Sequence, residues 1–360
     1  MKAVVWGCGG KGKEFLDRRV LNYKYDILCF TDSNSRLWGS YFEDRYKVIP
    51  PNDIVNFDYD IVIVCVVDHD EIINNMEKFG IDKKRIKIYK DLEKELCDAI
   101  VSKYDDNSDP EIQNVLDVYR TGELSFFGSY HPAYRNFSDV KRDADGFPYI
   151  VFEDKKMFYP KDHHFQILDG REVVADILYE QGENSPHRYI PDGYKMPPNA
   201  IILDAGVCEG NFALRYVEDA SKIYLVEADE RWMQALEMTF KPFREKVVFC
   251  NKFLSGRNNS KEITIDSLVN EKLDFLKMDI EGSEVYALLG GRKTLESSNT
   301  QCAICTYHRQ YDEDYVSFIM KSYGYATSKS KGYVFFSYDD TIADTLDLRR
   351  GVVYASKRSV

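Results

Sequence analysis

The chain has 360 residues and carries 48 lysines and arginines against 60 aspartates and glutamates, a formal net charge of −12 at pH 7. This length predicts two domains, or three, and the excess of acid argues against a broad basic surface for duplex DNA or anionic lipid. Hydrophobic residues make up 44% of the chain and aromatic residues 14%, so we expect packed, globular domains.

Neither a membrane span nor a secretory leader is expected. The longest apolar run covers residues 61–67, far short of the roughly 20 residues that cross a bilayer. At the N-terminus, the apolar stretch 3–6 is interrupted by Gly7 and then by charged residues, so it lacks the apolar core of a signal peptide. We therefore expect a cytoplasmic protein without a nucleic-acid partner. The sequence does not indicate its oligomeric state.

Residues 1–96 have the pattern of a small Rossmann-like α/β domain. Their apolar runs are continuous rather than alternating, and helix-length segments separate them, which is typical of a parallel sheet buried on both faces. The strands are expected at 2–6, 27–30, 61–67 and 85–89.

A glycine turn follows the first of these strands. Gly7, Gly9 and Gly12 form a Gly-x-Gly-x-x-Gly pattern before a helix, and Asp32 ends the next strand. Glycines of this kind let a backbone approach a pyrophosphate, and the acid can accept from ribose hydroxyls. The turn could hold NAD or a nucleotide-sugar, or it could be a purely structural turn. No convincing set of hydride-transfer residues accompanies it.

Residues 97–195 are expected to form a connecting α+β segment, with a helix near 110–119 and a hairpin of strands 149–152 and 156–159. Residues 196–360 then form a second α/β domain. Its seven strands, the last two joined without a long helix, predict a doubly wound sheet that ends in an antiparallel hairpin. The strands are expected at 200–203, 222–226, 247–250, 273–278, 301–306, 333–337 and 352–355, and the helices at 212–217, 231–240, 283–289 and 315–323.

The first strand of this domain runs into Asp204-x-Gly206-x-x-x-Gly210, and Glu227 closes the second. The loop lacks the dense glycines of a pyrophosphate site. This pattern is typical of S-adenosylmethionine binding, in which Asp204 orders the loop and the methionyl amine. Gly206 and Gly210 permit close backbone approach, and Glu227 accepts from the ribose hydroxyls.

Residues 165–356 resemble the FkbM-type methyltransferases. The resemblance rests on the segments 204–210, 264–268, 275–284 and, more loosely, 306–309, and it covers nothing in residues 1–96. It implies a class I methyltransferase fold, S-adenosylmethionine as cofactor and O-methylation. Within the cofactor loop this chain has Val-Cys-Glu209 where many members have Ala-Asn-x, and Glu209 is included among the cofactor-binding candidates.

Candidate catalytic residues follow two central strands. Asp279 and Glu281 lie just past one strand and His308 past its neighbour, so all three are expected at the edge of the sheet where ligands bind. Asp279 is also a cofactor-binding candidate. A sugar hydroxyl needs a general base or a metal. We expect His308 or Asp279 as the base, and the three residues could hold Mg²⁺. In the alternative, Glu281 caps a helix and His308 is a hydrogen-bonded loop residue.

His187 and Arg188 precede this domain, in a segment that could fold over the site and contact a substrate. The predicted function is S-adenosylmethionine-dependent O-methylation of a sugar, sugar-nucleotide or glycan hydroxyl. The sugar is inferred by analogy and from the nucleotide-type N-terminal unit. The alternatives are an NAD-dependent oxidoreductase or epimerase that uses the turn at 7–12, and a non-catalytic metabolite-binding protein.

Overall fold

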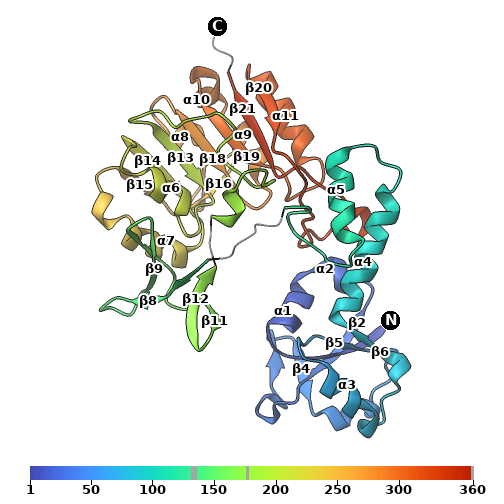
Figure 1. The fold of residues 1–360 in the computed structure, drawn as a ribbon. Helices are drawn as coiled ribbons and strands as arrows, with labels where there is room; N and C mark the ends of the chain where they lie inside the picture. The colour runs from blue at the N-terminus through green and yellow to red at the C-terminus, as the bar shows by residue number, and fades with distance from the viewer. Residues whose placement is uncertain (131–135, 176–177, 358–360) are drawn as a thin grey trace. The chain divides into compact units, whose positions relative to one another are not determined.

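The computed structural model describes residues 1–130, 136–175 and 178–357 and divides the chain into two compact units (Figure 1). Unit 1 comprises Met1–Ser129 and Phe335–Leu348, and unit 2 comprises Tyr130–Val334 and Arg349–Val360. Residue 96, where the sequence suggested a boundary, lies inside helix α4 (Tyr89–Tyr104). The division at 96 and 195 stays a sequence-based prediction, and the two units are described separately.

Unit 1 contains a six-stranded sheet of order β3-β4-β2-β1-β5-β6, in which every neighbouring pair is parallel except β3 with β4. All four residues of β5 are buried, as expected for a strand covered on both faces. The parallel sheet expected for this region is therefore confirmed. The strands are β1 (Lys2–Trp6), β2 (Asp26–Thr31), β3 (Tyr41–Phe42), β4 (Tyr46–Ile49), β5 (Ile61–Val64) and β6 (Ile86–Ile88).

The helices of unit 1 include the one expected near residue 110. It begins at Pro110, and the side chain of Asp109 accepts a hydrogen bond from the backbone of Glu111 at 2.8 Å, which caps the helix at its N-terminus. Unit 1 has helices α1 (Gly10–Asp17), α2 (Arg19–Asn22), α3 (Asp70–Met76), α4, α5 (Pro110–Tyr119) and α12 (Ile342–Thr345), and 3₁₀ helices at Ser35–Leu37, Pro51–Asn56, Glu77–Phe79 and Lys83–Arg85.

Unit 2 is built on a seven-stranded sheet of order β15-β14-β13-β18-β19-β21-β20. Strand β21 is antiparallel to both neighbours, and the other pairs are parallel. This is the doubly wound sheet with an antiparallel edge that the sequence predicts. The strands are β13 (Ile201–Ala205), β14 (Lys222–Val226), β15 (Val247–Cys250), β18 (Phe275–Met278), β19 (Gln301–Cys305), β20 (Ala326–Lys329) and β21 (Val352–Ser356).

The helices of unit 2 are fixed by local capping as well as by packing. Asp229 caps α7 through the backbone N–H of Arg231 at 2.8 Å. Asp266, in the 264–268 motif, accepts from the backbone of Thr294 at 2.8 Å and so holds the start of α10. The helices are α6 (Asn211–Tyr216), α7 (Glu230–Thr239), α8 (Ile265–Leu268), α9 (Glu284–Leu289), α10 (Arg292–Ser297) and α11 (Asp312–Ser322), and 3₁₀ helices occur at Tyr179–Gln181 and Lys241–Phe243.

Three small sheets accompany the large one in unit 2. The hairpin expected at 149–159 is confirmed, since β9 and β10 pair in antiparallel register. The sheets have orders β10-β9-β8, β11-β12-β7 and β16-β17. Their strands are β7 (Phe137–Asp139), β8 (Lys141–Arg142), β9 (Pro148–Phe152), β10 (Lys155–Phe158), β11 (Gln166–Leu168), β12 (Arg171–Ala175), β16 (Phe253–Leu254) and β17 (Glu262–Ile263).

The strand expected at 333–337 is wrong. Only Val334 forms an isolated bridge there, with Arg349, and the strand beside β21 is β20 instead. This apolar run contributes to the core of unit 1 instead. Phe335 is buried there, with its ring edge-on to Tyr119 of α5. Within the described part of the chain, no helix combines the length and apolar character needed to cross a membrane.

Candidate active site

A cavity of about 750 Å³ opens at the carboxyl ends of β13, β14 and β18 in unit 2. This is the edge at which doubly wound sheets bind ligands, and the volume suits a small-molecule site. Gly206 lines the cavity after β13, Glu227 after β14, and Asp279 and Glu281 after β18. His187 lines it from the segment that precedes β13.

The turn after β13 needs glycine for steric reasons. Gly206 has φ +72°, and a Cβ atom there would lie 1.6 Å from the carbonyl oxygen of Asp279. Gly210, at the start of α6, has φ +82°, and its Cβ would lie 2.7 Å from Leu236 Cδ2. Gly206 lines the cavity, whereas Gly210 is not among the lining residues. The first glycine therefore brings the turn close to β18, and the second packs the helix against α7.

Glu227 links the glycine turn after β13 to the start of α7. Its Oε2 accepts from the backbone N–H of Cys208 at 3.0 Å, and its Oε1 accepts from that of Asp229 at 2.9 Å. Each carboxylate oxygen keeps a further lone pair for a ligand hydroxyl. Glu209 also lines the cavity, and burial raises the pKa of its carboxyl group.

Asp204 is fully buried and does not line the cavity. Its Oδ1 lies 3.2 Å from Nζ of Lys277, which donates to the carbonyl oxygens of Ala205, at 3.3 Å, and of Gly206. Burial opposes the charge of Lys277, but the carboxylates of Asp204 and Asp279 raise its pKa. The pair therefore ties the glycine turn to β18, and Asp204 acts from beneath the cavity floor.

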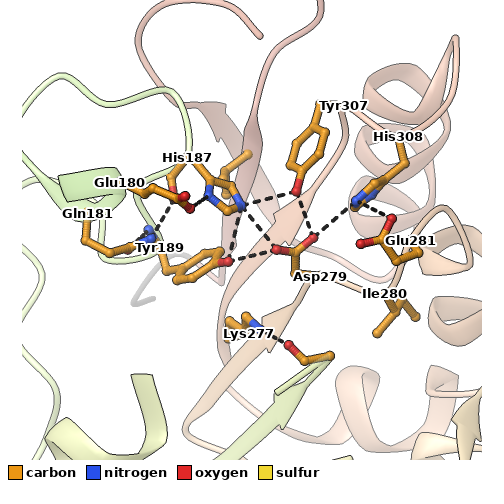
Figure 2. A network of polar contacts seen from close by, with 12 residues as sticks. Glu180, Gln181, His187, Tyr189, Lys277, Asp279, Ile280, Glu281, Tyr307 and His308 are labelled. Carbon is orange, nitrogen blue, oxygen red and sulfur yellow. Dashed lines mark hydrogen bonds and ion pairs between the residues drawn. The ribbon is translucent and has the colours of Figure 1, made fainter. Parts of the chain in front are cut away.

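Asp279 is the centre of a polar network (Figure 2). Its Oδ2 accepts from the Tyr189 hydroxyl at 2.8 Å and pairs with His187 Nε2 at 3.1 Å, and its Oδ1 accepts from the Tyr307 hydroxyl at 3.2 Å. Burial alone would raise the pKa of Asp279, but the hydrogen bond from His187 and the charges of His187, His308 and Lys277 hold it well below its usual value. Asp279 is therefore ionised.

His187 lies between two carboxylates. Its Nδ1 pairs with Glu180 at 2.9 Å, while its Nε2 faces Asp279. Burial would lower its pKa, but the hydrogen bonds to Asp279 and Glu180 raise it to about 9. His187 is therefore an imidazolium at neutral pH, and it lies in the wall of the cavity.

His308 lies behind Asp279 and is not among the residues that line the cavity. It is 3% exposed. Its Nδ1 lies 3.1 Å from Glu284, and its Nε2 lies 3.3 Å from Asp279 and 3.6 Å from Glu281. Burial would lower the pKa of His308, but Glu284 and the other two carboxylates raise it. Glu284 also accepts from the backbone of Ile280 at 2.9 Å, so it holds both the ring and the turn after β18.

Glu281 is exposed at the cavity edge in a strained backbone conformation. Its φ is +56°, a region that costs about 1–2 kcal/mol for a residue with a side chain. The next residue, Gly282, has φ +87°, and a Cβ there would lie 2.6 Å from Arg309 Nε. Desolvation, with the charges of Asp279 and Glu284, raises the pKa of Glu281 against the opposing charge of His308.

The structure brings together the three residues expected to hold Mg²⁺, Asp279, Glu281 and His308. Among the described residues, the sets whose ligand atoms lie within 4.8 Å of one another are Asp279 with Glu284 and His308, and His187 with Asp279 and Cys305. Mg²⁺ prefers oxygen ligands, whereas each of these sets includes a histidine nitrogen, and the second also includes a cysteine sulfur. Neither set has the ligand types that are typical of a magnesium site.

Arg188 is directed elsewhere. Its Nη1 pairs with Asp192 at 2.9 Å, and it lines two smaller cavities, of about 160 and 210 Å³, instead of the main one. Its carbonyl oxygen accepts from the Tyr354 hydroxyl at 2.5 Å. His187 and Arg188 are adjacent in sequence, but only His187 faces the main cavity.

The N-terminal turn in unit 1 repeats the backbone arrangement of the cofactor-type loop. Asp32 accepts from the backbone of Cys8 at 2.8 Å and of Asn34 at 2.8 Å. Gly7 has φ +119°, and a Cβ at Gly12 would lie 2.1 Å from the Gly7 carbonyl oxygen. Close packing therefore explains why glycine is needed at positions 7 and 12. A Cβ at Gly9, in contrast, would meet nothing within 4 Å. Nucleotide binding at this turn stays a prediction.

Tyr189 and Tyr307 were not among the predicted site residues, although both donate to Asp279. Tyr189 lies two residues after His187, and Tyr307 lies one residue before His308. This proximity to a candidate histidine was the sequence signal that could have identified them. Glu180 and Glu284 were not predicted either, although each pairs with one of the histidines. Their chain positions carry no pattern that marks such a pairing.

The sheet order of unit 2, its antiparallel last strand and the cavity after its first two strands define a class I methyltransferase fold. Residues 204–335 match the methyltransferase FkbM domain model, and residues 1–87 match the C2185-like N-terminal domain model. The chain thus carries an FkbM-family methyltransferase domain with an additional N-terminal C2185-like domain. This family implies S-adenosylmethionine as the methyl donor.

Among solved structures, a methyltransferase FkbM from Methylobacillus flagellatus is 14% identical with a TM-score of 0.49, over 98% of this chain and 89% of that one. A putative methyltransferase from Streptococcus mutans, in complex with S-adenosylhomocysteine, is 15% identical with a TM-score of 0.33, over 45% and 91%. An rRNA methylase from Streptococcus thermophilus is 14% identical with a TM-score of 0.34, over 46% and 90%. No curated protein sequence matches the chain.

Proposed function

We propose that this protein transfers a methyl group from S-adenosylmethionine to a hydroxyl oxygen of a sugar, sugar-nucleotide or glycan. The observation that carries the proposal is the cavity beside Gly206 and Glu227, within the segment that matches the FkbM domain. The O-methylation follows from the family resemblance, and the sugar remains the inferred acceptor.

The cavity residues fit the cofactor. Glu227 presents carboxylate oxygens for ribose hydroxyls, and the close approach of the Gly206 turn to β18 leaves backbone groups for the methionyl end. Glu180, Glu209 and Asp229 add acid to the lining, which favours a cationic ligand. When bound, the cofactor supplies an electrophilic methyl group on a sulfonium ion.

Of the three expected catalytic residues, Glu281 is the best placed to remove a proton from the acceptor hydroxyl. It lines the cavity, and its pKa is raised, which moves a carboxylate toward the working range of a base. Asp279 is held ionised by several donors and is a weak base. The pKa of His308 is raised by its three carboxylate neighbours, and the residue does not line the cavity.

Asp279 and His187 are assigned a positioning role. Positioning is the main requirement of methyl transfer, because the acceptor oxygen must lie in line with the methyl group. The ionised Asp279 can accept a hydrogen bond from an acceptor hydroxyl, and the cationic His187 keeps that carboxylate in place.

Calorimetric titration of the full-length protein with S-adenosylhomocysteine tests the proposal, followed by transfer of a labelled methyl group to sugar-nucleotide acceptors. We expect micromolar binding and acceptor-dependent transfer. Folded protein that binds NAD but not S-adenosylhomocysteine would favour the oxidoreductase alternative, and cofactor binding without transfer would favour the non-catalytic one. A cytoplasmic location and the absence of a nucleic-acid partner stay sequence-based predictions.

A further inference from the structure

A second hollow of about 870 Å³ adjoins the main cavity in unit 2. The two share Phe253, Leu254 and Ser283 in their walls. We call the second hollow the groove; besides the shared residues, its lining includes Ser255, Gly256, Arg257, Lys261, Glu262 and Tyr286. The groove is therefore continuous with the space assigned to the cofactor.

Two exposed aromatic side chains lie together in the lining of the groove. Phe253 is 59% and Tyr286 64% exposed, and they come from β16 and α9. Large apolar side chains left open beside a cavity mark a binding surface, and such rings stack on flat apolar faces of a ligand. A pyranose ring offers a face of this kind.

The backbone under the groove is closely packed. A Cβ at Gly256 would lie 3.1 Å from the carbonyl oxygen of Tyr286, and one at Gly290 would lie 2.4 Å from that of Ser255. The loop between β16 and β17 is therefore held against the end of α9. This contact fixes the groove wall relative to the helix that follows Asp279 and Glu281.

The groove and the main cavity differ in the charge of the residues that line them. The main cavity is rich in carboxylates, including Glu227 and Asp229. In the groove, Arg257 pairs with Glu262 at 2.7 Å and neutralises the acid among its lining residues, while Lys261 is exposed. Lys252, at the junction, donates to the carbonyl oxygen of Asn259 at 3.1 Å. The lining of the groove thus carries two cationic side chains and one acidic one, in a chain of net charge −12.

We propose that this groove binds the methyl acceptor, and that the acceptor is a sugar carrying a phosphate or diphosphate group. The aromatic rings of Phe253 and Tyr286 take the sugar, and Arg257 and Lys261 take the anion, since cationic side chains recognise phosphate oxygens. The inference rests on the proposed function, because it places an acceptor beside the cofactor cavity. A free sugar phosphate and a nucleotide-linked sugar share this chemistry.

The test is calorimetric titration of the full-length protein saturated with S-adenosylhomocysteine. The probes are glucose 1-phosphate, UDP-glucose and uncharged methyl glucoside. We expect the phosphorylated probes to bind more tightly than methyl glucoside. Added salt should weaken the binding of the phosphorylated probes, because it screens their charge. Tighter binding of UDP-glucose than of glucose 1-phosphate would indicate the nucleotide-linked source, and the reverse order the free sugar phosphate.

Substitutions locate the binding. Two variants should each bind the phosphorylated probes about tenfold or more weakly. They are the double variant Arg257→Gln with Lys261→Gln, and the single variant Tyr286→Ala. The matched control is Tyr315→Ala on α11, a 55% exposed tyrosine outside the groove, which should change nothing. Affinity for S-adenosylhomocysteine should be the same in every variant.

The inference is overturned if the protein binds S-adenosylhomocysteine but neither phosphorylated probe binds at millimolar concentration. It is also overturned if phosphate gives no advantage, or if the groove variants bind as the wild type does. Failure to bind S-adenosylhomocysteine at all would instead contradict the proposed function.

Discussion

His187 Nε2 lies 3.1 Å from Asp279 Oδ2, although the two residues are 92 positions apart in the chain. Asp279 belongs to the segment that matches the FkbM domain, whereas His187 precedes it. The wall of the cavity thus depends on a residue outside the matched segment. Any variant that removes His187 leaves the buried Asp279 without its nearest cationic partner.

The first prediction concerns the pH dependence of stability. In the folded protein the pKa of His187 is raised from 6.5 to about 9. The stabilisation it provides is therefore complete below pH 6.5 and is lost as the pH rises through 9, with a size of up to about 3 kcal/mol. Urea denaturation of the wild type and of His187→Gln should show stabilities that differ most at pH 6 and converge near pH 10. A pH-independent difference would contradict this assignment.

The second prediction uses the parallel between Glu227 and Asp32. Each carboxylate accepts from two backbone N–H groups, one in the glycine turn of its own unit. Glu227→Ala should weaken S-adenosylhomocysteine binding about tenfold or more, because charged hydrogen bonds to ribose and loop are lost. Asp32→Ala removes the equivalent contacts in unit 1 and should leave that affinity unchanged. Equal effects of both changes in calorimetry would count against the cavity in unit 2 as the cofactor site.

The third prediction separates steric clash from backbone strain. Gly206 and Gly324 both have positive φ, but a Cβ at Gly324 would meet nothing within 4 Å, whereas one at Gly206 would overlap the backbone of Asp279. Gly324→Ala should cost about 1–2 kcal/mol. Gly206→Ala should cost about 1–3 kcal/mol more, and it should reduce cofactor affinity. Urea denaturation midpoints measure the loss of stability in both variants, and calorimetry measures the loss of cofactor affinity in Gly206→Ala. Similar losses of stability at both positions would mean that the backbone after β13 shifts enough to accommodate the Cβ atom.

The fourth prediction concerns the base. Glu281→Gln should lower kcat about 100-fold without changing affinity for S-adenosylhomocysteine. In the wild type kcat should rise with pH until Glu281 is deprotonated, because its pKa is raised, and this limb should be absent in the variant. The control is Glu296→Gln on α10, whose partner is Arg292. A pH profile unchanged in Glu281→Gln would assign the proton transfer to another group.

The sequence by itself was sufficient for most of the parallel framework of both units, although it did not predict β4, which pairs in parallel with β2. Continuous apolar runs predicted β14 and β15 at their observed bounds, and β13, β18 and β19 to within two residues. The positive φ of Gly206 and the position of Glu227 directly after the next strand are also local features. Such features depend on burial and on backbone geometry within one turn, which the order of residue types encodes directly.

Only the tertiary structure decided how the site residues are used. His308 and Asp279 both follow central strands, yet the structure places His308 behind Asp279 and leaves Glu281 at the cavity edge. It turns Arg188 away from His187, and it packs Phe335 in unit 1 where the apolar pattern suggested a strand. Hydrophobic periodicity identifies which side chains are buried, but their partners are set by packing between distant segments.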